Sequence, residues 1–227
     1  MHSNRIRQKV KEDYESIGSE FSETRSSNWK EFIFFEPFLL SNLSIADLGA
    51  GNGRLIDFLK KYKPKKYLGV EQSKSLIEAA RKKYPKANFL EADMIDFKSK
   101  EKFDALFAIA SFHHVPPDLQ EKTLEKWKTS VKPGGLLFMT NWNLKQKKYL
   151  PQLILSMIFP RYGFKGTLIP WKNKVSRYYY SFSKRRLDAL LKKSGYKVLY
   201  NEYVNQDSIS NAFQARNIVT IAQNEKR

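Results

Sequence analysis

The chain has 227 residues, of which 41% are hydrophobic, enough for one packed domain and too many for a disordered chain. It has no cysteine, which excludes disulfides, thiolate nucleophiles and cysteine-based metal sites, and only three histidines, so we expect no metal. The net charge of +18 predicts a polyanionic partner, and the absence of a signal peptide or a long apolar run predicts a soluble cytoplasmic protein.

The first forty residues predict a helical cap. Apolar residues recur at helical spacing at Val10, Tyr14, Ile17 and Phe21, and a second, aromatic-rich helix is predicted at 29–40. We expect this cap, residues 1–40, to pack on the rest of the domain.

Strands and helices alternate in the next hundred residues. Strands are predicted at 44–48, 67–70, 88–90, 105–110 and 136–140. Helices are predicted at about 54–62, from an N-cap at Ser73 to just before Pro85, and at about 117–131. Alternating elements with nearly continuous apolar strands predict an α/β fold with a doubly wound, mostly parallel sheet.

The alternation is interrupted after the fifth strand. Residues 144–176 are rich in lysine, proline and aromatic residues, and we interpret them as a basic insertion with a short helix near 153–159. The chain then continues with a helix that has an N-cap at Ser183 and ends at Gly195, and with strands at 196–203 and 217–223. We therefore expect one domain with a seven-stranded, Rossmann-like sheet, completed by residues 177–227.

The stretch "IADLGAGNGRL", residues 45–55, follows the first predicted strand and has the pattern G-x-G-x-G. In a parallel sheet the first strand-to-helix turn contacts ligands, and glycine lets the backbone approach them. A dinucleotide loop requires G-x-G-x-x-G, but Arg54 or Ile56 occupies the position of its last glycine. The loop therefore argues against an NAD-dependent dehydrogenase, and a tight turn beside ordinary surface acids stays open as an alternative.

This loop, led by "DLG" and followed by Glu71 in "YLGVEQS", resembles the nucleoside-binding loop of class I S-adenosylmethionine-dependent methyltransferases. The segments "LEADMIDF" and "FDALFAIASFHHV" extend the resemblance, which implies S-adenosyl-L-methionine as cofactor and residues 41–143 as the nucleoside-binding half. Glu71 would accept hydrogen bonds from the ribose diol, and Asp93 would meet the adenine amino group. The cofactor-binding residues implied are Tyr14, Arg25, Asp47, Gly49, Gly51, Gly53, Glu71, Gln72, Asp93, Met94 and Ala110.

A narrower resemblance is carried by "YESIGSEFSETRSSNW" at 14–29, "WNLKQKK" at 142–148 and "PWKNKVSRYYYSFSKRRLDALLKKSGY" at 170–196. Together these segments resemble the tRNA wobble-uridine carboxymethyl methyltransferases, which esterify a 5-carboxymethyl group on the anticodon uridine. The resemblance implies tRNA as the partner and a small activating partner protein. Two departures, "RSSNWKE" where the family has R-x-K-P-W-P and "GAGNGR" where it has GCGNGK, concern the substrate more than the cofactor.

A carboxylate acceptor needs positioning more than deprotonation, because it is already a nucleophile at neutral pH. A cation or a hydrogen-bond donor can hold it, and the candidates are Arg25, Arg177, His113 and His114. Two alternatives stay open. Arg25 can instead bind the cofactor's methionine carboxylate, and one of the two histidines can pack beneath the fourth strand.

Thirteen lysines and arginines, but only one acid, lie between Lys145 and Lys193, interleaved with aromatic residues. This pattern is typical of RNA binding through phosphate contacts and base stacking. The residues expected to contact RNA are Trp29, Lys145, Lys147, Lys148, Trp171, Tyr178 and Tyr179. The alternatives are a solvated basic face, aromatic residues that belong to the core, and a membrane-surface helix in "LPQLILSMIFPRYGFKG".

The sequence is therefore compatible with three functions. The first is a methyltransferase that acts on tRNA, and the second is a methyltransferase that acts on a small or lipid-like molecule. The third is a non-catalytic RNA-binding or adaptor module that retains the fold.

Overall fold

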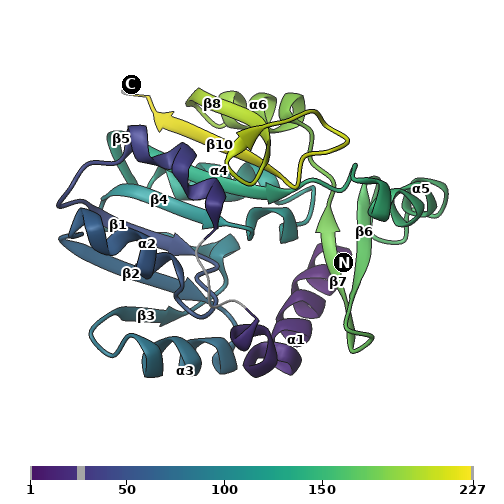
Figure 1. Cartoon of the computed structure of the whole chain (residues 1–227), viewed down its shortest axis with the longest axis horizontal. Coiled ribbons are helices and arrows are strands. Elements are labelled where there is room, and N and C mark those ends of the chain that lie inside the picture. Colours follow the sequence, from purple (N-terminus) through teal and green to yellow (C-terminus); the bar gives the residue numbers. More distant parts are fainter. Residues whose placement is uncertain (1, 25–28, 226–227) are drawn as a thin grey trace.

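The computed structural model describes residues 2–24 and 29–225. Its centre is an eight-stranded sheet with the order β3-β2-β1-β4-β5-β10-β8-β9 (Figure 1). The strands are β1 (Ser44–Leu48), β2 (Lys66–Glu71), β3 (Asn88–Glu91), β4 (Phe103–Ile109), β5 (Val131–Trp142), β8 (Tyr196–Asn205), β9 (Ser208–Ile209) and β10 (Asn217–Asn224). The first five pair in parallel, whereas β10 runs antiparallel to β5 and β8.

The predicted doubly wound, mostly parallel sheet is confirmed, but the predicted number of seven strands was wrong. The eighth strand, β9, has two residues and pairs with the end of β8. The chain reverses there at Gln206, whose φ of +60° is left-handed although the residue is not glycine. A strand this short, after a turn without a glycine, leaves no periodic signal in the sequence.

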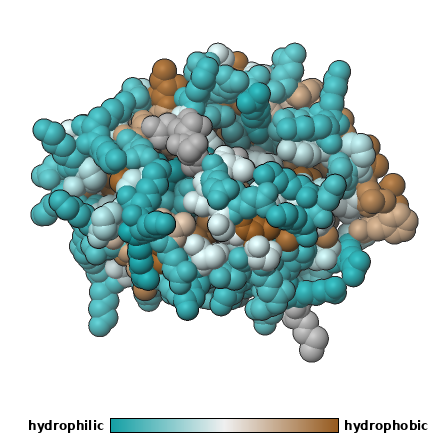
Figure 2. All heavy atoms as spheres, turned by 60° about the horizontal axis from the view of Figure 1, so that its bottom comes forward, coloured by the Kyte–Doolittle hydropathy of each residue, from teal (hydrophilic) through white to brown (hydrophobic). Residues whose placement is uncertain are grey.

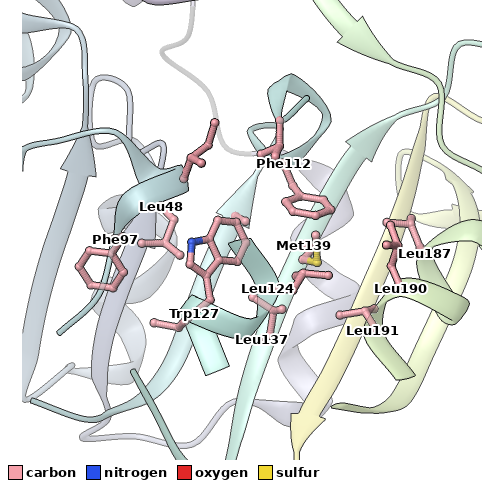
Figure 3. Close-up of a cluster of buried hydrophobic side chains, with 14 of the residues drawn as sticks. Leu48, Phe97, Phe112, Leu124, Trp127, Leu137, Met139, Leu187, Leu190 and Leu191 are labelled. Atoms are coloured by element: carbon pink, nitrogen blue, oxygen red, sulfur yellow. The ribbon is translucent and has the colours of Figure 1, made fainter. Parts of the chain in front are cut away.

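Helices cover both faces of the sheet because the side chains of each strand alternate between them. The helices beside the sheet are α2 (Leu55–Leu59), η2 (Lys60–Tyr62), α3 (Lys74–Lys83), η3 (Met94–Asp96), η4 (Phe112–His114), α4 (Gln120–Lys128) and α6 (Lys184–Lys193). In β4, Leu106 and Ala108 pack in the cluster that contains α4 and α6, whereas Phe107 packs with α2 on the other face. Figure 3 shows part of the first cluster, with Leu124 and Trp127 of α4 opposite Leu187, Leu190 and Leu191 of α6.

Local signals explain where two of these helices begin and end. Ser73 and Ser183 each accept a hydrogen bond from the backbone N–H three residues later, so both predicted N-caps are confirmed. Gly195 follows α6 with a φ of +77°, the left-handed conformation that commonly ends a helix.

The N-terminal segments pack against the two faces of the domain. Helix α1 (His2–Glu23) contacts α3 and the strand β7 described below, and its Ile6 and Val10 enter the main core. The second predicted helix forms as η1 (Lys30–Phe38), a 3-10 helix that contains Pro37. Proline has no N–H and disfavours a regular α-helix, while Phe32 and Phe35 anchor the segment against the opposite face.

The insertion after β5 holds more structure than the sequence predicts. It forms η5 (Lys147–Tyr149), α5 (Leu150–Ile158) and a hairpin of β6 (Gly166–Trp171) and β7 (Val175–Tyr180). The hairpin turns at Lys172 and Asn173, both with left-handed φ, without the glycine that usually marks such a turn. The hairpin stands beside α1 on the side of the domain where the parallel strands end (Figure 1).

Helix α5 leaves apolar side chains uncovered. Leu155 and Ile158 of this helix are 58% and 63% exposed, and Phe159, the next residue along the chain, is 67% exposed. In Figure 2 most of the surface is hydrophilic, and apolar side chains gather at the end of the molecule where α5 lies. None of the helices in the described ranges is both long and apolar enough to cross a membrane.

Candidate active site

A cleft lies where strands β1, β2 and β4 end. It encloses about 910 Å³, a volume that includes the solvent at its open mouth. Its wall combines the glycine loop after β1 and the ends of β2, β4 and β5 with α1 and β7. Ligands of doubly wound folds bind at this edge of the sheet, where neighbouring connections diverge to opposite faces.

The three glycines of the loop have positive φ angles of 77° for Gly49, 56° for Gly51 and 76° for Gly53. A Cβ on Gly49 would lie 2.5 Å from the Cβ of Ser111, and one on Gly53 would lie 3.0 Å from the ring of Phe89. A Cβ on Gly51 would meet no protein atom within 4 Å among the described residues. Gly49 and Gly53 are therefore required by packing, whereas Gly51 presents bare backbone to the cleft.

Glu71 connects the ends of β1 and β2. Its Oε2 accepts a hydrogen bond of 2.9 Å from the N–H of Gly51, and its Oε1 accepts bonds of 2.9 Å from the N–H groups of Gln72 and Ser73. Burial raises the pKa of Glu71, while the three N–H bonds oppose that shift. An ionised carboxylate retains acceptor capacity beyond these bonds, so Glu71 holds the glycine loop and also fits a ribose diol.

Asp47, near the end of β1, lies deeper in the cleft. The hydroxyl of Tyr67 donates to its Oδ2 at 2.9 Å, whereas its Oδ1 is buried without a hydrogen-bond partner in the part of the chain that the structure describes. Burial is the main cause that raises the pKa of Asp47 to about 7. An unpartnered acceptor at this position fits a cationic group such as the amine of S-adenosylmethionine.

The structure separates the two residues expected near the adenine. Met94 lines the cleft, but Asp93 lies outside its lining. The carboxylate of Asp93 accepts a bond of 2.8 Å from Arg7 of α1 and another of 2.9 Å from the N–H of Ile95. Arg7 and Ile95 each use one oxygen of this carboxylate and leave acceptor capacity on both, so the expected contact of Asp93 with the adenine amino group stays a prediction.

Ala110, after β4, does line the cleft. It has a left-handed φ of +51°, and its N–H donates to both the carbonyl and the hydroxyl of Thr140. These two bonds fix the end of β4 beside the glycine loop.

Arg177 of β7 is a buried cation at the other end of the cleft, only 3% exposed. Its guanidinium lies 5.4–5.8 Å from the ring centres of four aromatic residues: Tyr14, Phe21, Trp142 and Tyr179. Its Nη1 donates to the hydroxyl of Tyr14 at 3.3 Å. Within residues 2–24 and 29–225, Arg177 forms no salt bridge and its buried Nε has no hydrogen-bond partner.

Both histidines line the cleft in the neutral form. The Nδ1 of His114 donates to the carbonyl of Tyr178 at 2.6 Å, which leaves Nε2 to accept from the hydroxyl of Tyr14 at 2.9 Å. The Nδ1 of His113 accepts from the backbone N–H of Trp142 at 3.2 Å, so its proton is on Nε2. Burial, assisted by the charge of Arg177, lowers the pKa of His114 to about 3 and that of His113 well below its usual value.

The residues expected to bind RNA fall in different environments. Trp29 and Tyr179 line the cleft, Lys147 and Lys148 are exposed, and Lys145 is half-buried. Trp171 is partly exposed and packs against Phe21 with ring centres 6.1 Å apart.

Tyr178 does not fit its expected stacking role, because its ring is fully buried in the main core. Neighbours in a strand point to opposite sides, so Tyr178 faces the core and Tyr179 faces the cleft. Arg25 lies outside the described residues.

The sequence did not identify several residues of this site. Phe21 and Trp142 are two of the four aromatic residues that surround Arg177, and Arg7 donates a hydrogen bond to Asp93. These residues act through tertiary contacts with distant elements, and a single sequence carries no signal for such contacts. In the part of the chain that the structure describes, no cluster of three or more histidine and acidic residues has the geometry of a metal site.

The comparisons with known proteins agree with this geometry. Residues 45–135 match the family described as a methyltransferase domain. A tRNA (carboxymethyluridine(34)-5-O)-methyltransferase of Arabidopsis thaliana is 31% identical over 59% of this chain and 32% of its own length. A trans-aconitate 2-methyltransferase of Rhodopseudomonas palustris is 30% identical over 52% of this chain and 45% of its own. This chain thus spans a third to a half of the length of these two relatives.

Solved structures share the fold. A Haloferax volcanii methyltransferase, solved in complex with the Trm112 methyltransferase activator, is similar with a TM-score of 0.71 and 14% identity, over 96% of this chain and 98% of the other. Further structures of this fold are described as S-adenosylmethionine-dependent methyltransferases. The matched domain, the fold and the cleft residues together identify S-adenosylmethionine as the cofactor.

We predict that Glu71→Ala weakens S-adenosylmethionine binding about 5- to 150-fold. This corresponds to roughly 1–3 kcal/mol for polar groups left unpaired, here the ribose hydroxyls and the loop N–H groups. Calorimetric titration measures the change. Glu78→Ala, which removes an exposed carboxylate from α3, is the matched control and should bind as the unmodified chain does. An unchanged affinity for the Glu71 variant would remove this residue from the site.

We also predict that S-adenosylmethionine binds more tightly as the pH rises through 7. A bound cation favours ionised Asp47, whose pKa in the folded protein is about 7, so binding releases a proton below this pH. One linked proton gives up to about a tenfold gain in affinity between pH 6 and pH 8. Asp47→Asn should lose this gain while retaining any titration of the ligand itself. The same pH dependence in both proteins would contradict the assignment.

Proposed function

We propose that this chain, which carries an S-adenosylmethionine-dependent methyltransferase domain, methylates a carboxylate oxygen. The acceptor that we propose is the 5-carboxymethyl group of a tRNA wobble uridine. The observation that carries the proposal is Arg177, a buried cation in the cofactor cleft that forms no salt bridge with the described residues.

A carboxylate matches this cation chemically. Burying an unpaired charge costs several kcal/mol. A cation–π contact with one aromatic ring offsets only about 0.5–2 kcal/mol of this cost. A bound carboxylate supplies the missing counter-charge, and the planar guanidinium can hold it through two parallel hydrogen bonds. The unpartnered Nε of Arg177 is one donor available for such a pair.

The other residues of the site also suit an acceptor that needs no deprotonation. When bound, S-adenosylmethionine supplies a methyl group on a positively charged sulfur, and its transfer to a carboxylate oxygen yields a methyl ester without releasing a proton. His113 and His114 have pKa values well below neutrality, so neither is adapted to act as a general base at pH 7. His113 and His114 form hydrogen bonds with Trp142 and Tyr14, which are two of the aromatic residues around Arg177.

The names of the curated relatives support the same acceptor group. Carboxymethyluridine and aconitate both carry carboxylates, although one is a tRNA nucleoside and the other a small acid. The basic surface of this chain favours tRNA, since its net charge is +18 and the segment after β5 contributes many of the cations. A small carboxylic acid is the second candidate, favoured by the trans-aconitate relatives.

A small activating protein forms part of the proposal. The support is the similar Haloferax volcanii structure, which was solved together with such an activator. If this chain needs one, methyl transfer from S-adenosylmethionine should rise when a partner of that kind is added.

The direct test follows a labelled methyl group from S-adenosylmethionine into bulk tRNA and, in parallel, into a small-molecule extract. We expect label in tRNA that mild alkali releases, because alkali hydrolyses methyl esters. Alkali-stable label in tRNA would contradict a carboxylate acceptor. Label confined to the small-molecule fraction would contradict tRNA and leave the second candidate.

We predict that Arg177→Met lowers kcat/KM for the carboxylate acceptor at least about 30-fold. Truncating one partner of a buried charge pair costs roughly 2–5 kcal/mol, and 1.4 kcal/mol corresponds to a factor of ten. The affinity for S-adenosylmethionine should change less than about threefold. Arg186→Met removes an exposed arginine from α6 and is the matched control.

If Arg177→Met instead abolished binding of S-adenosylmethionine, Arg177 would hold the cofactor's own carboxylate. The proposal for the acceptor would then lose its support.

A further inference from the structure

A second cleft opens beside the first and shares Trp29 and Trp142 with it. This outer cleft encloses about 950 Å³ out to its open mouth. Its wall is formed by η1, by the segment after β5 and by the loop before β10. We propose that the outer cleft binds one nucleotide of single-stranded RNA, the nucleotide that bears the acceptor carboxylate. This inference rests on the proposed function and names the subsite that the RNA would occupy.

Aromatic side chains of the outer cleft form a stack that a base can extend. The rings of Trp142 and Tyr149 stack on each other, with centres 6.2 Å apart and planes inclined by 22°, and Trp142 also stacks on Tyr179 with centres 5.1 Å apart. Trp29 contributes a third ring, and all three residues are partly exposed. Stacking on such rings is the main way in which proteins hold unpaired bases.

Cations surround these rings. Lys30, Lys148 and Arg216 are exposed residues of the wall, and none of them forms a salt bridge with another described residue. The ammonium of Lys148 lies 4.7 Å from the centre of the Tyr149 ring. Cations beside stacking surfaces fit a phosphate next to a base, since phosphate contacts supply most of the affinity for nucleic acids.

Asn217 adds a buried polar group to this wall. It is 6% exposed and lies directly opposite Trp142 in the pairing of β10 with β5. Its Nδ2 donates to Oε1 of Glu31 at 2.7 Å, which identifies Oδ1 as the remaining acceptor. This Oδ1 has no hydrogen-bond partner in the described part of the chain, and an acceptor of this kind matches the N3–H donor of uracil.

Asn143 joins two of the segments that form the wall of the outer cleft. Its Nδ2 donates to the carbonyls of Ala212 and Ala215 at 2.7 Å and 2.9 Å, and its backbone N–H donates to the carbonyl of Arg216 at 3.0 Å. Asn143 is fully buried. These bonds join the loop after β5 to the loop before β10, so the wall is formed before a ligand arrives.

The shared tryptophans connect the two clefts. The Trp142 ring contributes to the outer wall and also lies 5.6 Å from the guanidinium of Arg177. A base held in the outer cleft can therefore direct a short substituent past Trp142 toward Arg177. This arrangement suits a uridine whose carboxylate is carried on a one-carbon arm.

The test measures binding of a labelled anticodon stem-loop with 5-carboxymethyluridine at the wobble position, by fluorescence anisotropy over a range of salt concentrations. The double variant Lys148→Gln/Arg216→Gln should bind about tenfold or more weakly at low salt, with a salt slope reduced by about two. Binding of S-adenosylmethionine should not change. The matched control, Lys122→Gln/Lys197→Gln, removes two exposed lysines from α4 and β8 and should behave as the unmodified chain does.

A second measurement locates the base directly. With 4-thiouridine at the wobble position, ultraviolet light should produce cross-links to Trp29, Trp142 or Tyr149. The proposal would be overturned by cross-links confined to other parts of the chain, by a double variant that binds RNA like its control, or by no RNA binding at all.

These outcomes also separate the two proposals. RNA binding that depends on the outer cleft, without methyl transfer to RNA, would support the cleft and contradict the proposed function. Methyl transfer to RNA that the double variant performs with an unchanged KM would support the function and contradict the cleft.

Discussion

The burial of Arg177 is the constraint on which the acceptor half of the cleft depends. A guanidinium that is nearly withdrawn from solvent and forms no salt bridge with the described residues is costly to the folded protein, because the buried carboxylate of Asp13 interacts with it only from beyond salt-bridge distance. The surrounding residues reduce this cost with aromatic faces and with the hydroxyl of Tyr14. They come from α1, β5 and β7, so the N-terminal helix and the hairpin after β5 must both pack on the sheet to complete the site. The charge is left for a ligand to neutralise.

The cofactor half of the cleft depends instead on the hydrogen bonds that Glu71 accepts from backbone N–H groups. They join the loop after β1 to the loop after β2, so the bare backbone at Gly51 is fixed in position before any ligand binds. A pre-formed site avoids the entropic cost of ordering these loops during binding. Asp47 also lines the cleft, and its unpartnered oxygen suits the cationic part of the cofactor. Under the proposed function, the cleft presents acids to the cofactor and a cation to the acceptor.

The sequence predicted the features that are determined locally. The alternation of strands and helices, the two serine N-caps and the glycine loop follow from periodicity and from single-residue conformational preferences. The hairpin of β6 and β7 was not predicted, because its turn uses Lys172 and Asn173 without a glycine. The ring of aromatic residues around Arg177 was not predicted either, since Tyr14 and Arg177 are 163 positions apart. Tyr178 was expected to stack on RNA, but its place in β7 directs it into the core.

Under the proposed function, the chain recognises a negatively charged carboxylate through Arg177. The most direct measurement compares methyl transfer to two anticodon stem-loops that differ in one group, with 5-carboxymethyluridine in one and its neutral isostere 5-carbamoylmethyluridine in the other. We expect label in the carboxylate RNA alone, and binding of the carboxylate RNA that is weakened by Arg177→Met while binding of the amide RNA is not. Equal methylation of the two RNAs, or equal loss of binding for both in the variant, would contradict recognition of a carboxylate by Arg177.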